Sequence, residues 1–246
     1  MPNTGRMERA AFLPHALAGA SAANVIYLGA AQCRRKFELF YPDGFADETY
    51  LVAERSHKER AHLEWDAQLG PGPLRKLLAR GEFRAVADAA VRIEARANLL
   101  FSFERMALRD AVKTPAGARL FATELHAFLY GHGSPQRRFA DWVEALADLP
   151  RPGSRLLTWP VATVFGFIAR PDRHLLFKPR ATRKAALLYG FALDASPTPA
   201  WAAYLDLLTF AAVLRRDLDR RPGFRARDMI DLQSFMWVQG APEYEA

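Results

Sequence analysis

The chain has 246 residues and only one cysteine, Cys33. A single cysteine excludes an internal disulfide and a zinc site built from several cysteines, and it fits a reducing cytoplasm. No uninterrupted apolar run reaches the roughly 18 residues of a membrane-spanning helix. The N-terminal stretch lacks the basic, apolar and cleavage regions of a signal peptide. We therefore predict a cytoplasmic protein that does not enter the membrane.

Strand-like alternation, internal repeats and low-complexity tracts are scarce or missing, whereas apolar residues recur at three- and four-residue spacings. This pattern predicts an all-α fold with one β-like run at 174–177. Pro152 and Gly153 form the clearest linker. They predict two helical lobes, 1–150 and 151–246, with one compact domain as the alternative.

Capping residues mark the expected helix starts. Asp47 precedes an amphipathic pattern at 48–68, and Thr114, Ser134 and Thr198 are each followed by proline, which favours the first helical turn. Residues 11–40 also have a helical pattern. We expect a helix to begin at each of these four caps.

The 48–68 pattern contains two histidines, His57 and His62, and Glu64. Metalloprotease helices carry their histidines four residues apart, which places them on one face. An interval of five turns the second histidine away from the first. We therefore expect no metal site, and the sequence indicates no cofactor.

Positive charge is concentrated near the end of the chain. The net charge is +7, and residues 170–227 hold 12 Lys and Arg against 5 Asp and Glu. The remaining residues hold 34 − 12 = 22 basic against 27 − 5 = 22 acidic side chains. A localised surplus of this kind favours a polyanionic partner, so we expect a nucleic acid.

Four basic residues surround the expected start of a helix near residue 179: Lys178, Arg180, Arg183 and Lys184. A helix N-terminus combines backbone N–H groups with a positive dipole, which suits a phosphate. The alternative interpretation is that Pro179 simply fits the first turn and that the cations are solvated.

The last helical pattern, 225–240, has a narrow polar stripe on an otherwise apolar helix. Asp228, Asp231 and Ser234 lie three residues apart on that stripe. A buried carboxylate needs a cation, a backbone donor or a chemical role. The structural alternative is that Asp228 caps the helix and Asp231 completes an imperfect capping box, with Arg225 or Arg227 as counterion.

The order of elements from Arg155 to Gly240 resembles the catalytic lobe of the helix-hairpin-helix DNA glycosylase superfamily. PVATVFGFIA is similar to the helix after the hairpin, HLLFKP to the apolar run, RATRKAALLYGF to the helix behind the catalytic aspartate, and DMIDLQSFMWVQG to the closing helix. The Gly-x-Gly of the family is missing from LLTWPV. Arg180 follows Pro179 where the family has its aspartate, and Pro160 stands where lyase-type members have lysine.

The resemblance implies binding to double-stranded DNA and hydrolysis of the N-glycosidic bond of a damaged or modified base, which is flipped out of the helix. The alternatives are a non-catalytic nucleic-acid-binding module and a helical protein-interaction domain. The sequence carries no signal of oligomeric state. For the glycosylase we expect catalytic groups on Asp228, Asp231 and Lys178, phosphate contacts from Arg155, Arg180, Arg183 and Lys184, and base stacking on Trp159 and Trp237.

Overall fold

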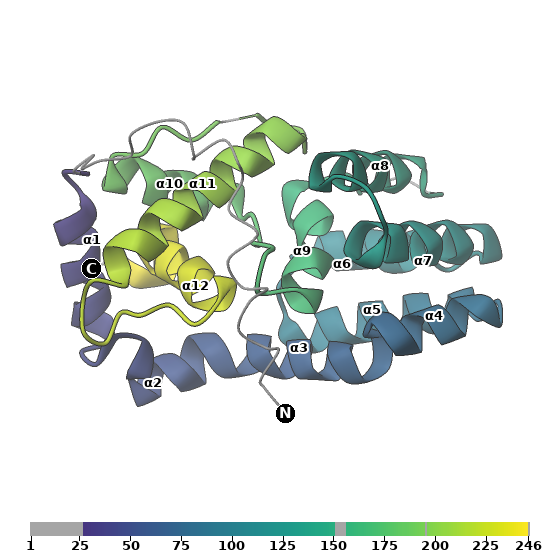
Figure 1. Cartoon of the computed structure of the whole chain (residues 1–246), viewed down its shortest axis with the longest axis horizontal. Coiled ribbons are helices and arrows are strands. Elements are labelled where there is room, and N and C mark those ends of the chain that lie inside the picture. Colours follow the sequence, from purple (N-terminus) through teal and green to yellow (C-terminus); the bar gives the residue numbers. More distant parts are fainter. Residues whose placement is uncertain (1–26, 151–155, 195, 246) are drawn as a thin grey trace, which may run out of the picture.

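A computed structural model describes residues 27–150, 156–194 and 196–245. All regular secondary structure in these residues is helical and none of it is a strand, which confirms the predicted all-α class (Figure 1). No helix in the described part of the chain has the length and apolar character needed to cross a membrane.

The α-helices, in chain order, are α1 (Ala30–Phe40), α2 (Glu48–Tyr50), α3 (Ser56–Leu69), α4 (Pro71–Ala79), α5 (Phe83–Ala97), α6 (Ser102–Ala111), α7 (Pro115–Tyr130), α8 (Pro135–Asp148), α9 (Trp159–Ala169), α10 (Pro179–Tyr189), α11 (Trp201–Leu218) and α12 (Met229–Gly240). A π-helix, η5 (Leu51–Arg55), joins α2 to α3, and two short 3₁₀ helices are η4 (Gly44–Ala46) and η6 (Pro242–Tyr244).

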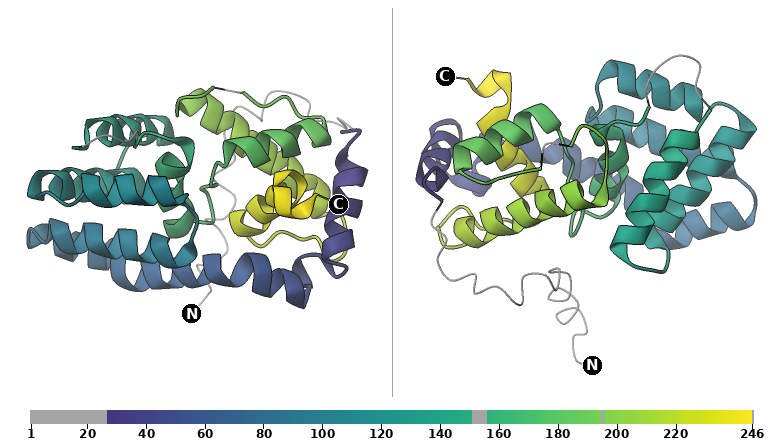
Figure 2. Two further views of the ribbon diagram at one scale, coloured as in Figure 1. Left: turned by 180° about the vertical axis from the view of Figure 1, so that it is seen from behind. Right: turned by 90° about the horizontal axis from the view of Figure 1, so that it is seen from above.

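The helices form two groups that lie side by side in Figures 1 and 2. In one group α9 packs against α3, α5, α7 and α8; in the other, α12 packs against α1, α10 and α11. The continuous stretch α2–η5–α3 runs along the edge of both groups. Each group therefore contains helices from both sides of residue 150. The predicted linker at Pro152 and Gly153 lies outside the described residues.

Helix α9 is the centre of its group, and every one of its residues is buried. A helix that is apolar on all sides has no solvent face, so it is covered by neighbours all round. Gly166 permits the closest approach, since a Cβ at this position would lie 3.0 Å from the ring of His174 and 3.1 Å from Phe128.

The predicted β-like run is buried but does not pair with another strand. The Phe177 amide donates to the Thr163 hydroxyl at 3.0 Å, and the Leu175 amide donates to the Tyr204 hydroxyl at 3.1 Å. Side-chain hydroxyls of α9 and α11 thus accept the backbone hydrogen bonds that a neighbouring strand would accept in a sheet. The β-like interpretation was therefore wrong, because the run is a linking segment rather than a strand.

Three of the four predicted caps are confirmed. Asp47, Thr114 and Ser134 each accept a backbone N–H from the first turn of α2, α7 and α8. The fourth was wrong, because α11 begins after Ala200 without a side-chain cap, two residues beyond Thr198. The predicted helix at 48–68 is present with a π-helical interruption. Of the predicted helix at 11–40, residues 11–26 lie outside the described chain and α1 occupies the end.

Candidate nucleic-acid interface

The Asp231 carboxylate is fully buried and closely surrounded by donors. Arg227 contributes its backbone N–H at 2.8 Å and its guanidinium at 2.9 Å, and Arg55 and Tyr50 donate at 3.0 Å and 2.6 Å. Burial raises the pKa of Asp231, but the hydrogen bonds from Arg227 and Tyr50 and the charge of Arg55 outweigh it, so the pKa lies below its ordinary value. Asp231 is therefore a buried, ionised group in the contact between α12 and η5.

Asp228 occupies the N-cap of α12. Its carboxylate accepts the Ile230 amide at 2.9 Å and pairs with both terminal nitrogens of Arg55, at 3.0 Å and 2.9 Å. Asp228 is therefore the N-cap that the structural alternative predicted, but Asp231 accepts the amide of Arg227, one residue before the N-cap, so the two carboxylates do not complete a capping box. Arg227 pairs with Asp231, which confirms one of the two predicted counterions, and Arg55, which is distant in sequence, pairs with both carboxylates.

A second ionic cluster lies one turn further along the same pair of helices. The Lys58 ammonium donates to Glu54 and to the Ser234 hydroxyl, both at 2.8 Å, and Tyr244 donates to Glu54 at 2.6 Å. Burial lowers the pKa of Lys58, while the adjacent Glu54 acts in the opposite direction. The sequence analysis assigned no role to these residues, although Glu54 and Lys58 lie within the amphipathic pattern at 48–68.

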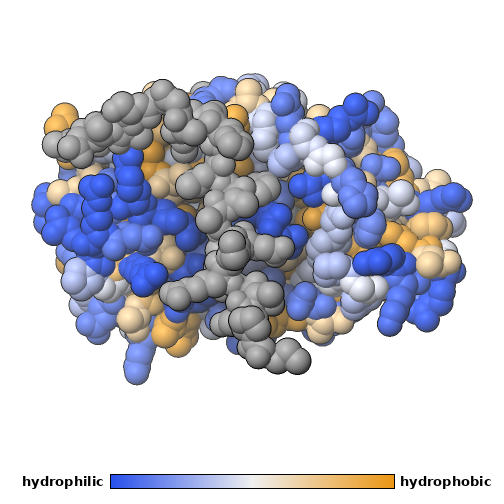
Figure 3. Space-filling view, in the orientation of Figure 1, coloured by the Kyte–Doolittle hydropathy of each residue, from blue (hydrophilic) through white to orange (hydrophobic). Residues whose placement is uncertain are grey.

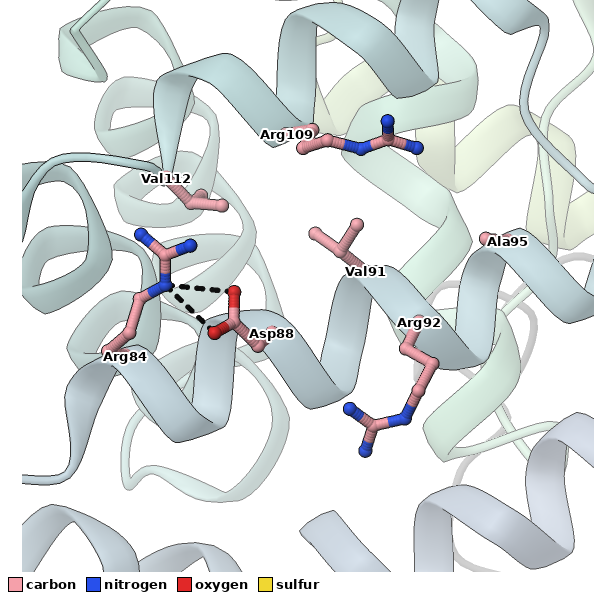
Figure 4. A pocket seen from close by; sticks show the side chains of 7 residues that line it. All are labelled: Arg84, Asp88, Val91, Arg92, Ala95, Arg109 and Val112. Atoms are coloured by element: carbon pink, nitrogen blue, oxygen red, sulfur yellow. Dashed lines mark hydrogen bonds and ion pairs between the residues drawn. The ribbon is translucent and has the colours of Figure 1, made fainter.

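Lys178 and the two predicted catalytic carboxylates, Asp228 and Asp231, have different partners. Lys178 makes no hydrogen bond or ion pair with Asp228 or Asp231 within the described residues. Two hollows of about 300 Å³ lie elsewhere, and no predicted site residue lines either of them. One is formed by His62, Asp66, Pro71, Tyr130, Ala169, Arg170, Pro171 and Asp172. The other, between α5 and α6, is formed by Arg84, Asp88, Val91, Arg92, Ala95, Arg109 and Val112 (Figure 4).

Lys178 is the N-cap residue of α10, and its ammonium lies 4.4 Å from the centre of the Phe101 ring. Burial lowers the pKa of Lys178, and the carboxylates of Glu104 and Glu94 act against this shift. The amine therefore contacts an aromatic ring of α6 rather than the carboxylates of α12.

The two predicted stacking tryptophans differ in exposure. Trp159 is 2% exposed, and its indole N–H donates to the Ser196 carbonyl at 2.9 Å while its ring packs on Phe177. Trp237 is half-buried and donates to Glu243 at 2.9 Å. A core position leaves no open ring face on Trp159 for a base.

The predicted phosphate contacts of α10 lie in different surroundings. Arg180 is exposed and makes no hydrogen bond or ion pair with the described residues. Lys184 pairs with Glu245 at 2.5 Å, and Arg183 donates to the Ser196 carbonyl at 3.2 Å. Arg155 lies outside the described residues. Arg180 is therefore the cation of this set that is open to a phosphate.

A second group of cations follows the end of α11, where Figure 3 shows strongly hydrophilic side chains gathered on the left of the molecule. Arg220, Arg221 and Arg225 are exposed. The acidic side chains next to them have other partners: Asp217 accepts the Tyr189 hydroxyl at 2.5 Å, and Asp219 accepts the Ala226 amide at 3.1 Å. Neither carboxylate forms an ion pair with Arg220, Arg221 or Arg225.

Comparisons with protein-family models, curated proteins and solved structures found no match. The helix-hairpin-helix resemblance therefore stays a prediction. Within the described residues, no group of three or more His, Cys, Asp and Glu side chains is arranged to hold a metal ion.

Proposed function

We propose that the protein binds nucleic acid through phosphate contacts made by its surface arginines. The observation that carries this proposal is the way charge is distributed over 170–227. Arg227 pairs with buried Asp231, and Arg170 and Arg173 share Asp172. The exposed arginines Arg180, Arg220, Arg221 and Arg225 make no ion pair with the described residues.

Phosphate contacts by arginine supply affinity without sequence preference, because the phosphate backbone is the same at every base. A planar guanidinium also matches the geometry of a phosphate better than an ammonium does. Partner recognition by these residues is therefore expected to depend on charge and on salt concentration rather than on base sequence.

Base excision stays a separate hypothesis. Its predicted carboxylates, Asp228 and Asp231, are both engaged by Arg55 and by backbone amides. These contacts hold α12 in place, so they support a role in folding. The geometry therefore favours a binding module over a glycosylase, and an assay for base release from uracil-containing or alkylated duplexes separates the two.

The test of binding uses a fluorescein-labelled DNA duplex of arbitrary sequence and fluorescence anisotropy. We expect the triple variant R220E/R221E/R225E to weaken binding by about tenfold or more, and R180E to weaken it to a smaller extent. The matched control is R137E, which reverses an exposed arginine that already pairs with Asp141 on α8. Equal affinities for the wild type, the triple variant and the control would refute the proposal.

A further inference from the structure

Two phenylalanines at the start of α6 are exposed to solvent. Phe101 is 52% exposed and Phe103 is 57% exposed, and their rings lie 5° from parallel with centres 5.8 Å apart. Met106, one turn along, is 61% exposed. Most large apolar side chains of this chain are buried, so a group of three exposed ones indicates a binding surface. We call Phe101, Phe103 and Lys178 the aromatic corner.

The backbone that carries the aromatic corner is held by a buried carboxylate. Glu94 is 0% exposed and accepts the amides of Leu99 and Leu100 at 3.1 Å and 2.7 Å. Asn98, with φ of 54°, is the single non-glycine residue of positive φ in the described chain. Arg105 donates to both Glu94 and Asn98. Strained backbone and a buried charge are costly, and they persist where the surroundings fix them.

A second buried carboxylate fixes the first turn of α6. Glu104 accepts the Phe101 amide at 3.0 Å and the Thr158 hydroxyl at 2.6 Å. It therefore ties the aromatic corner to the start of α9. A surface held in this way loses little conformational entropy when a partner binds, which favours affinity.

Lys178 places a positive charge on this surface from α10. Its ammonium lies 4.4 Å from the centre of the Phe101 ring, within the range of a cation–π contact. Stacked aromatic rings next to cations are the combination with which proteins bind unpaired nucleotides: the bases stack on the rings and the phosphates contact the cations.

We propose that the aromatic corner is a stacking platform for unpaired bases of a nucleic-acid strand, with Lys178 contacting an adjoining phosphate. This inference rests on the proposed nucleic-acid binding and names the part of the ligand that the protein recognises. Phe103 is the main stacking ring, because one face of Phe101 is already occupied by Lys178. The adjacent positive charge favours a nucleic acid over an apolar peptide.

The test measures the affinity of the full chain for labelled single-stranded oligothymidylate and for its duplex with oligoadenylate. Stacking of one base on an aromatic ring is worth about 1–3 kcal/mol. We therefore expect F103A to weaken binding to the single strand by about tenfold and to leave duplex binding unchanged. F103Y should bind the single strand like the wild type, since it keeps the ring.

Two controls separate stacking from other effects. F103L keeps apolar bulk but has no ring, so it should resemble F103A, whereas wild-type affinity of F103L for the single strand would overturn the platform and indicate a protein-binding surface. L63A removes another exposed apolar side chain, on α3, and should have no effect. Because Phe103 is exposed, we expect the circular dichroism spectra of all variants to match the wild type.

The outcomes distinguish this inference from the function on which it rests. If neither probe binds the wild type, nucleic-acid binding itself fails. If both probes bind and R220E/R221E/R225E weakens them while F103A does not, the proposed function stands and the stacking platform is rejected.

Discussion

The Tyr50 hydroxyl donates a 2.6 Å hydrogen bond to the Asp231 carboxylate, which joins α2 to α12 across 181 positions of the sequence. Arg55 contacts the same carboxylate from the adjoining π-helix, η5. A π-helix is a rare interruption that changes the angular position of the side chains along a helix. Together these contacts fix the last α-helix to the long helical stretch that runs along both groups.

The carboxylates of α12 should differ in their contribution to stability. D231N leaves Arg55 and Arg227 without the buried charge that they share, so we expect the free energy of unfolding to fall by about 3–5 kcal/mol. D228N should cost less, because asparagine caps a helix about as well as aspartate. Urea denaturation measures both, and equal losses for the two variants would contradict the burial argument.

Stability should decrease in mildly acidic solution because of His174. Burial, and then the charges of Arg138 and Arg170, lower the pKa of His174 from 6.5 to about 3. Below the ordinary pKa the unfolded chain takes up a proton that the folded protein excludes, so the free energy of unfolding falls by up to about 1.4 kcal/mol per pH unit.

H174N should reduce this dependence on pH, and His57, whose pKa burial lowers to about 4, should account for part of what is left. H132N, at an exposed position, is the matched control. The measurement is urea denaturation at several pH values between about 7 and about 5. An unchanged slope in H174N would show that the ring is protonated in the folded protein.

Helix α12 crosses α10 at a glycine. A Cβ on Gly240 would lie 1.9 Å from the backbone oxygen of Ala181, which cannot move without displacing α10. We expect G240A to lower the free energy of unfolding by about 1–3 kcal/mol or more. G72A is the control, because a Cβ at Gly72 meets no atom within 4 Å. Equal melting temperatures for the two variants would contradict the close crossing.

Glu245 should compete with a phosphate for the cations of α10. Glu245 pairs with Lys184, and the hydrogen bond and charge of Lys184 lower the pKa of Glu245. The charges of Lys36 and Arg180 lower this pKa further. E245Q removes the competing negative charge, so we expect severalfold tighter binding of the DNA duplex. E243Q is the control, since Glu243 accepts from Trp237 instead. Weaker binding by E245Q would mean that the pair supports the interface.

Local chemistry predicted three helix caps and the pairing of Arg227 with Asp231, but not the partners that are distant in sequence. Asp47, Thr114 and Ser134 act on amides within their own first turn, so sequence alone identifies them. Arg55 lies 176 positions from Asp231, and no local rule selects it from the many arginines of the chain. The sequence did show that Asp231 needs a partner.

The sequence also predicts the burial of some aromatic rings but not the exposure of others. Trp159 begins a helix that is apolar on every side, and that pattern already indicates burial. Phe101 and Phe103 flank Ser102 at a helix start, and their exposure depends on Glu94 and Glu104, which hold the backbone around them. Both carboxylates are close to the rings in sequence, but spacing alone does not show that they accept the backbone amides of this turn and leave the rings in solvent.

The salt dependence of duplex binding tests the account most directly. The logarithm of the association constant should fall linearly with the logarithm of salt concentration, with a slope set by the number of phosphates contacted. If Arg220, Arg221 and Arg225 each contact one phosphate, R220E/R221E/R225E should reduce the magnitude of that slope by about three, and R137E should leave it unchanged. Identical slopes for the wild type and the triple variant would contradict the proposal that this surface binds nucleic acid.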